Sequence, residues 1–220
     1  MLATFVIELV LAGFVFWKYR SEKVTRLVVT TLVLLAVFQL AEYNVCTGAF
    51  GVDSLTWSRI GYAAITILPA LGIHTLSVVA RKPNRLLVGG AYALAAAFAL
   101  FYLTVGHGLT SSVCGGNYVI FEVAPQANSL YAIYYYGLEI AAAGLAFYYA
   151  RHTKQPKIKK ALYGIMAGYA CLLIPTTTVN IIDPETIHGI PSIMCGFAVL
   201  LALIVVLYVL PNVATVKRYK

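Results

Sequence analysis

Three glutamates and one arginine interrupt long apolar stretches of this sequence, and they are its clearest candidates for chemistry. Glu8, Glu42, Glu139 and Arg59 each lie within or at the end of a run of roughly 20 mainly apolar residues. A charge in such a run is costly unless it is paired, neutralised or in contact with water. These residues therefore predict either a ligand-binding site or buried pairs that hold helices in register.

Spacing groups Arg59 with other polar side chains. Gln39 and Glu42 are three residues apart, as are Arg59 and Tyr62, so each pair shares one helix face. A short connection joins the two stretches, which must run antiparallel and bring Glu42 near Arg59. A pocket in which Arg59 meets an anionic ligand fits this spacing, and so does a structural Arg59–Glu42 pair. The predicted ligand-binding residues are Gln39, Glu42, Arg59, Tyr62, Tyr135 and Glu139.

No sequence signature supports catalysis, a metal or a cofactor. Motifs of the GxSxG, HExxH or GxxxxGK[ST] type do not occur, and there is no CxxC. His74 lies alone in its apolar stretch and is predicted to pack there. The lysines lie at the ends of the stretches, so none is placed to carry retinal. We expect no enzyme activity, no cofactor and no metal site.

The four cysteines fall into two groups. Cys46 and Cys114 lie in two connections expected on the outer face, where an oxidising compartment favours a disulfide between them. Two free thiols are the alternative. Cys171 and Cys195 lie within apolar stretches and are predicted to pack as small apolar residues.

Seven apolar stretches must position these side chains. With 61% hydrophobic and only 11% charged residues, the chain has too little polar surface for a soluble domain. We predict an all-α, polytopic membrane bundle of seven transmembrane helices, which forms a single domain over residues 1–220. The expected spans are 2–17, 24–44, 55–80, 86–105, 129–150, 158–181 and 190–212.

Basic residues orient this bundle. Fifteen of the 16 Lys and Arg residues fall in alternate connections or at the C-terminus, and Arg59 is the exception. The positive-inside rule then places the N-terminus outside and the C-terminus in the cytoplasm, as a multi-pass protein of the inner (plasma) membrane. The basic charge indicates topology and contact with lipid headgroups rather than nucleic-acid binding.

Three local features predict departures from simple straight helices. The connection 106–128 contains an alternating segment at 117–123 that predicts a short hairpin or lid. Pro69 and Pro175 lie inside the third and sixth spans and predict kinks. The threonine run 176–178 is expected to bond to carbonyl groups that Pro175 leaves free.

Several short motifs resemble one family. They are Ala41-Glu42-Tyr43, Trp57-Ser58-Arg59-Ile60-Gly61-Tyr62, Ile67-Leu68-Pro69, Ile190-Pro191-Ser192 and Gly196-Phe197. Together they resemble the seven-helix sensor region at the N-terminus of prokaryotic histidine kinases, which also caps some diguanylate cyclases. The resemblance implies an outward-facing sensor that passes a signal along its last helix to a cytoplasmic transmitter. No transmitter follows the seventh span, so the chain is expected to be either a stand-alone version that acts through a partner or a protein with another role altogether.

The favoured function is a receptor-like membrane sensor that binds a small molecule or lipid in an outer-half pocket and signals to a cytoplasmic partner. A structural or accessory subunit of a larger membrane complex is one alternative, and a small-solute or ion transporter is another. The expected partners are membrane lipids, a small-molecule ligand, and a cytoplasmic or membrane-complex protein, with no nucleic acid.

Overall fold

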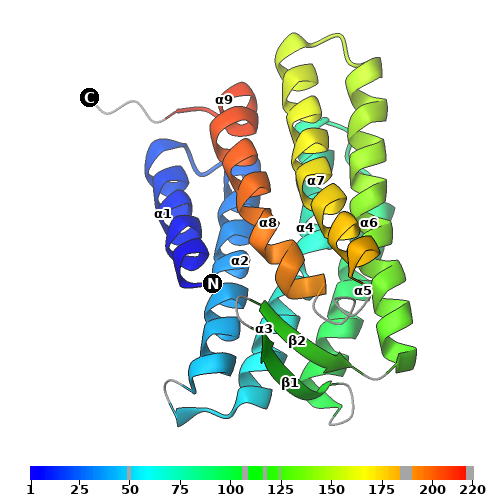
Figure 1. Ribbon diagram of the computed structural model, residues 1–220. Coiled ribbons are helices and arrows are strands. Elements are labelled where there is room, and N and C mark those ends of the chain that lie inside the picture. The colour runs from blue at the N-terminus through cyan, green and yellow to red at the C-terminus, as the bar shows by residue number, and fades with distance from the viewer. Residues whose placement is uncertain (49–50, 106–108, 116–117, 124, 184–189, 217–220) are drawn as a thin grey trace.

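The computed structural model describes residues 1–48, 51–105, 109–115, 118–123, 125–183 and 190–216. These residues form a bundle of helices with a two-stranded hairpin across one end (Figure 1). In chain order the elements are α1 (Leu2–Lys18), α2 (Lys23–Thr47), α3 (Ser54–Thr66), α4 (Leu68–Val79), α5 (Arg85–Thr104), β1 (Leu109–Gly115), β2 (Tyr118–Val123), α6 (Pro125–His152), α7 (Pro156–Ile182), α8 (Ile190–Ile204), a π-helical turn (Val205–Val209) and α9 (Leu210–Val213).

Six helical segments in the described part of the chain are long and apolar enough to cross a membrane. They have 20 to 27 residues each, and they are Lys23–Thr47, Ser54–Val79, Arg85–Thr104, Ser129–His152, Pro156–Ile182 and Ile190–Val213. A helix satisfies its backbone hydrogen bonds internally, as a lipid environment requires. The remaining predicted span corresponds to α1, which has 17 residues and packs along α2.

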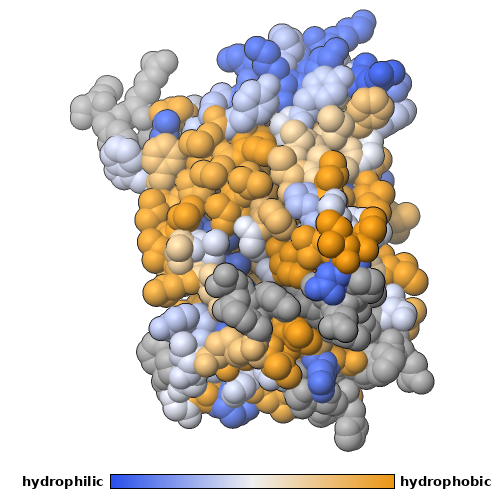
Figure 2. All heavy atoms as spheres, viewed as in Figure 1, coloured by the Kyte–Doolittle hydropathy of each residue, from blue (hydrophilic) through white to orange (hydrophobic). Residues whose placement is uncertain are grey.

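The basic connections gather at one end of the bundle, which we call the basic end. It carries the segments 18–26, 81–85 and 151–160, while the hairpin lies at the opposite, hairpin end (Figure 1). Figure 2 shows hydrophilic residues at the basic end and a largely hydrophobic surface over the middle of the bundle. The basic residues of the C-terminus, Lys217, Arg218 and Lys220, lie outside the described residues.

The two intrahelical prolines have different consequences. Ile67 separates α3 from α4, two residues before Pro69, because proline has no N–H to continue the helical ladder. Helix α7 instead continues through Pro175 to Ile182. The hydroxyls of Thr176 and Thr178 donate at 2.8 Å to the carbonyls of Leu172 and Ile174, and neither of these is the Cys171 carbonyl that Pro175 leaves without its N–H partner.

The predicted hairpin is confirmed and is tied to the helices. Strands β1 and β2 pair antiparallel, with Val113 opposite Ile120. Val119 and Phe121 of β2 are buried against the bundle. The predicted disulfide between Cys46 and Cys114 joins the end of α2 to β1. The free cysteines Cys171 and Cys195 pack within the bundle, half-buried and buried respectively.

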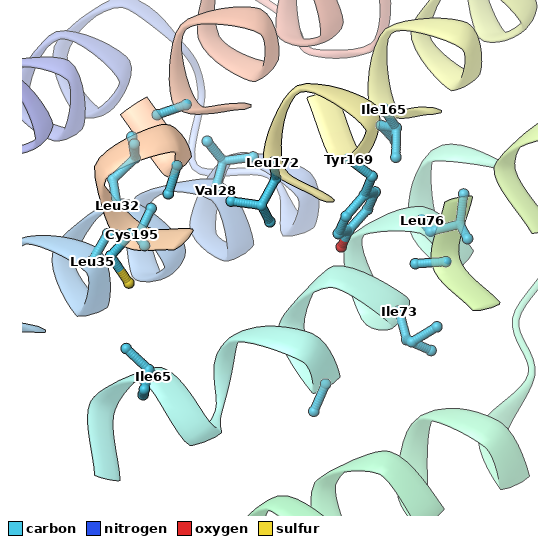
Figure 3. Close-up of a cluster of buried hydrophobic side chains, with 14 of the residues drawn as sticks. Val28, Leu32, Leu35, Ile65, Ile73, Leu76, Ile165, Tyr169, Leu172 and Cys195 are labelled. Atoms are coloured by element: carbon cyan, nitrogen blue, oxygen red, sulfur yellow. The ribbon is translucent and has the colours of Figure 1, made fainter. Parts of the chain in front are cut away.

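The core between α2, α4, α7 and α8 depends on small residues. Figure 3 shows Tyr169 of α7 reaching toward α4. A Cβ placed on Gly72 of α4 would overlap the Tyr169 hydroxyl oxygen. A Cβ on Gly168 of α7 would lie 2.5 Å from the side chain of Leu201 in α8. Glycine at these positions lets helices approach closely, as is common in membranes.

Candidate ligand-binding site

Aromatic side chains cluster beneath the hairpin, around Tyr62. The Tyr62 ring centroid lies 4.9 Å from that of Tyr102, 5.1 Å from that of Phe121 and 5.7 Å from that of Tyr131. These rings come from α3, α5, β2 and α6, so the cluster joins four elements that are distant in sequence. Tilted and edge-to-face pairs at such separations are favourable packing arrangements.

Tyrosine hydroxyls of α6 satisfy the break between α3 and α4. The Tyr134 hydroxyl donates to the Thr66 carbonyl oxygen at 2.7 Å, and the Tyr131 hydroxyl lies 3.1 Å from Thr66 Oγ1. Thr66 is the last residue of α3, where Pro69 interrupts the normal ladder. Backbone groups at such a break need side-chain partners in an apolar environment. The tyrosine hydroxyls of α6 therefore provide hydrogen-bond partners at the break between α3 and α4.

A large cavity lies beside this cluster, and we call it the hairpin cavity. Its volume is about 560 Å³, within the usual size range of small-molecule sites. Residues of α3, β2, α6, α7 and α8 form its walls, among them Tyr62, Phe121, Tyr135 and Met194. Its described lining is mainly aromatic and aliphatic, with Ser129, Thr177 and Asn180 as polar members and no charged side chain.

One wall of the hairpin cavity reaches the outer surface of the bundle. Ile140 lines the cavity and is also 60% exposed, on the part of α6 that would face lipid. Ile133 of the same helix and Ile181 of α7 are also exposed apolar residues. An apolar molecule in the bilayer would therefore meet the cavity from the side.

Two of the six predicted ligand-binding residues, Tyr62 and Tyr135, line the hairpin cavity. The other four, Gln39, Glu42, Arg59 and Glu139, are not among its described lining residues. The six therefore do not share one cavity in the described structure. A single pocket that holds all six residues is not observed among the described residues, and a ligand-binding role for each of them stays a prediction.

Gln39 and Glu42 connect elements to one another. The Thr4 hydroxyl of α1 lies 2.8 Å from Gln39 Oε1, which links α1 to α2. The buried Glu42 carboxyl is hydrogen-bonded to the side chain of Ser192 in α8. Ser192 Oγ in turn accepts from the Val119 backbone N–H of β2 at 3.0 Å. This chain of hydrogen bonds connects α2, α8 and the hairpin.

Arg59 lies near the start of α3 and interacts electrostatically with Asp53. Asp53 caps α3 by accepting from the Thr56 backbone N–H at 2.9 Å and from the Thr56 hydroxyl at 2.8 Å. These hydrogen bonds hold the pKa of the Asp53 carboxyl below its ordinary value, and Arg59 acts in the same direction. Among the described residues, the expected Arg59–Glu42 pair is not observed.

Glu139 is buried in the middle of the bundle beside a second, small cavity, which we call the Glu139 cavity. Its volume is about 50 Å³, which is enough to admit water. Glu139 Oε2 has no hydrogen-bond partner among the described residues. Tyr135 and Met194 line both this cavity and the hairpin cavity, so the two lie next to each other.

Sequence reasoning did not find several residues that matter here. Phe121, Thr177 and Asn180 complete the hairpin cavity. Cys195 of α8 lies within electrostatic range of Glu8, Glu42 and Glu139, so the three buried carboxyl groups converge from three helices. The apolar runs identified these carboxyl groups as exceptional, but no spacing signal indicated which helices are neighbours.

The described helices and their apolar surface define the class of protein: a helical, multi-pass membrane protein with an internal cavity next to its hairpin. Comparison with protein-family models, with curated proteins and with solved structures finds no match.

Proposed function

We propose that this chain is a receptor-like membrane sensor that binds an apolar small molecule or lipid in the hairpin cavity and signals to a cytoplasmic partner. The observation that carries the proposal is the cavity of about 560 Å³, with aromatic walls and a few polar groups. Such a composition suits a ligand with a large apolar body and one or two hydrogen-bonding groups. The exposed wall at Ile140 suits entry from the bilayer.

The proposal includes an orientation. We place the protein in the inner (plasma) membrane of the cell and assign α1 as a seventh span. The hairpin end then lies outside and the basic end lies in the cytoplasm. At about 1.5 Å per residue, the 17 residues of α1 are just long enough to cross the apolar core. The concentration of basic residues at one end supports this orientation.

The last span is the proposed output. Ile190, Pro191 and Met194 of α8 line the hairpin cavity, and Ser192 between them is bonded to the hairpin and to Glu42. A ligand that displaces this end of α8 would move a helix that runs to the basic end. The span contains a π-helical turn at Val205–Val209, a feature often found at functional positions.

A photoreactive fatty acid tests the binding site. Protein in neutral detergent is labelled with a diazirine-bearing fatty acid, and the modified peptides are mapped by mass spectrometry. We expect labels on the cavity segments 129–140 and 190–194. Ala132 lines the cavity, so Ala132→Phe should reduce that labelling by about fivefold or more, because a single steric change is worth about 1 kcal/mol or more.

The matched control is Ala96→Phe, at an exposed position of α5 away from the cavity. In the Ala96→Phe variant, the fatty acid should label the cavity segments as strongly as it does in the unaltered protein. Labels spread evenly over the apolar surface, and unchanged by Ala132→Phe, would remove the hairpin cavity as a binding site.

A small-solute or ion transporter is the second candidate, favoured by the arrangement of cavities. The Glu139 cavity adjoins the hairpin cavity on one side. On the other side it shares Gly72, Tyr169 and Leu201 with a third cavity of about 60 Å³. Reconstituted liposomes test this candidate: a proton or solute flux that Glu139→Gln abolishes supports transport, and absence of flux in the unaltered protein argues against it.

A further inference from the structure

A second large cavity lies at the opposite end of the molecule, between α2, α4 and α5, and we call it the basic cavity. Its volume is about 470 Å³. Lys23, Arg81 and Arg85 lie in its wall, together with the polar side chains of Ser77 and Asn84. It shares none of its described lining residues with the hairpin cavity, so it is a separate site.

The charge of this wall is of one sign. Three cationic side chains line the basic cavity, and its described lining contains no carboxylate. All three side chains are exposed, so their charged groups are available to a ligand. Lys23 and Arg81 also line an adjoining cavity of about 340 Å³, to which Lys157 contributes a further cation and Glu22 one carboxylate. A cluster of this kind attracts an anion that can accept several hydrogen bonds. The guanidinium group of arginine binds phosphate particularly well.

The backbone at Arg81 is held in an unusual conformation. Its φ is +55°, in the left-handed region where glycine or asparagine is the usual residue at the end of a helix. The turn is fixed by the Lys82 backbone N–H, which donates to the Ser77 carbonyl oxygen at 3.1 Å. A bulky residue in this region is strained, and such strain tends to occur at functional positions.

The start of α5 adds to the same electrostatic field. Asn84 caps this 20-residue helix by accepting from the Leu87 backbone N–H at 3.0 Å. Asn84 and Arg85 both belong to the cavity wall, so the positive end of the helix dipole lies at the cavity.

The depth of the cavity matches a headgroup at a membrane surface. His74 also lines the cavity and lies five residues before Val79, where α4 ends, which is about 8 Å along the helix. Leu86, next to Arg85, is 88% exposed, on a helix whose surface is largely apolar and open. A phosphate among the basic residues would therefore place attached acyl chains along exposed α5.

We propose that the basic cavity binds a phosphate group, carried either by an anionic lipid headgroup or by a small soluble compound. Lys23, Arg81 and Arg85 supply the charge, and Asn84 with the α5 N-terminus supplies polar contacts. Basic pockets between membrane helices are known to hold phospholipid headgroups.

Binding to purified protein in neutral detergent tests the site. The probes are inorganic phosphate, dihexanoyl phosphatidylglycerol and, as a zwitterionic control, dihexanoyl phosphatidylcholine. Removing two cations by Lys23→Gln with Arg81→Gln should weaken phosphatidylglycerol binding by about 10- to 30-fold, because each basic residue near a lipid headgroup contributes about 1 kcal/mol. The matched control, Lys159→Gln with Lys160→Gln, removes the same charge at the same end outside the cavity and should change binding less than about twofold.

Arg81→Gly guards against misfolding as an explanation. Glycine accepts the left-handed backbone, so this variant should remain as thermally stable as the unaltered protein, while its phosphatidylglycerol binding weakens by about fivefold, the loss expected for one cation. Tighter binding of phosphatidylglycerol than of inorganic phosphate assigns the site to lipid. Equal binding of the two keeps the phosphate site and assigns it to a soluble compound. Equal binding of phosphatidylcholine, or equal loss in the Lys159 and Lys160 control, would overturn the proposal.

Discussion

The Tyr134 hydroxyl donates to the Thr66 carbonyl oxygen at 2.7 Å, and Thr66 Oγ1 donates to the Tyr62 carbonyl oxygen at 2.6 Å. Ser192 similarly connects Glu42 to the Val119 backbone. At the scale of single residues, the buried polar groups thus join helices to one another. In an apolar interior, each such bond matters most when its loss leaves the partner unpaired. Polar contacts therefore keep the helices around the hairpin cavity in register.

Tyr134→Phe is expected to destabilise the protein by about 1–2 kcal/mol, because the Thr66 carbonyl would lose this partner. The apparent melting temperature in detergent should fall by about 2–4 °C for each kcal/mol. Tyr148→Phe, on an exposed part of the same helix, should leave it nearly unchanged. Equal melting temperatures for the two variants would show that the helix break does not need this hydroxyl.

At the scale of elements, close approaches of helices decide the packing. Gly72 admits the Tyr169 hydroxyl between α4 and α7. Gly164 and Gly168 of α7, four residues apart, admit Tyr208 and Leu201 of the last span. The spacing is that of a small-residue packing motif, which is visible in the sequence itself. The interface of α7 with both neighbours therefore depends on glycine.

Gly72→Ala should destabilise the protein by about 1–3 kcal/mol, because its new methyl group would overlap the Tyr169 hydroxyl. Tyr169→Phe removes that oxygen, and the next ring atom would then lie 3.3 Å from the Ala Cβ. The double variant should therefore be more stable than the sum of the two single changes predicts. A thermal-stability double-mutant cycle measures this coupling, and strictly additive effects would contradict the close approach.

Loss of the Cys46–Cys114 disulfide should lower stability by about 2–4 kcal/mol, because it closes a long segment between α2 and β1. Cys46→Ser with Cys114→Ser is compared with Cys171→Ser, which removes a free thiol. A reductant should lower the melting temperature of the unaltered protein and leave that of the double variant unchanged. If reductant has no effect on either protein, the bridge does not contribute to stability.

At the scale of the whole molecule, the two ends have different chemistry. The basic end carries the described cation-rich connections and the basic cavity, whereas the hairpin end carries the disulfide and the neutral hairpin cavity. The hairpin is held to α2 by a covalent bond and to α8 through Ser192. Such a division suits a molecule whose ends face different compartments.

Site-directed labelling tests the seven-span orientation. Single cysteines at Val52 and at Lys154, in a background without other accessible cysteines, are treated in whole cells with a membrane-impermeant maleimide. We expect labelling at Val52 and none at Lys154, because basic segments stay in the cytoplasm. An epitope at the N-terminus should be accessible from outside only if α1 crosses the membrane. If the N-terminal epitope lies on the same side of the membrane as Lys154, α1 does not cross the membrane and the protein has six spans.

The sequence alone was sufficient for the helical elements, the break near Pro69, the hairpin and the disulfide partners. Each of these depends on local composition, on proline chemistry or on a small number of candidate cysteines. Hydrophobic length identifies a membrane helix because the bilayer itself imposes the length. Charge asymmetry likewise predicts which connections lie together, as the common location of 18–26, 81–85 and 151–160 bears out.

Only the tertiary structure decided which side chains meet. A helix face can be inferred from spacing, but the neighbour of that face depends on how all the helices pack. Hence Glu42 bonds to Ser192 of the last span, and Arg59 interacts with Asp53 beside it in sequence. The predicted set of Gln39, Glu42, Arg59, Tyr62, Tyr135 and Glu139 is divided among several environments for the same reason. The four charged residues Glu8, Glu42, Arg59 and Glu139 are thus not among the described lining residues of the hairpin cavity, in which Tyr62 and Tyr135 are the members that the sequence predicted.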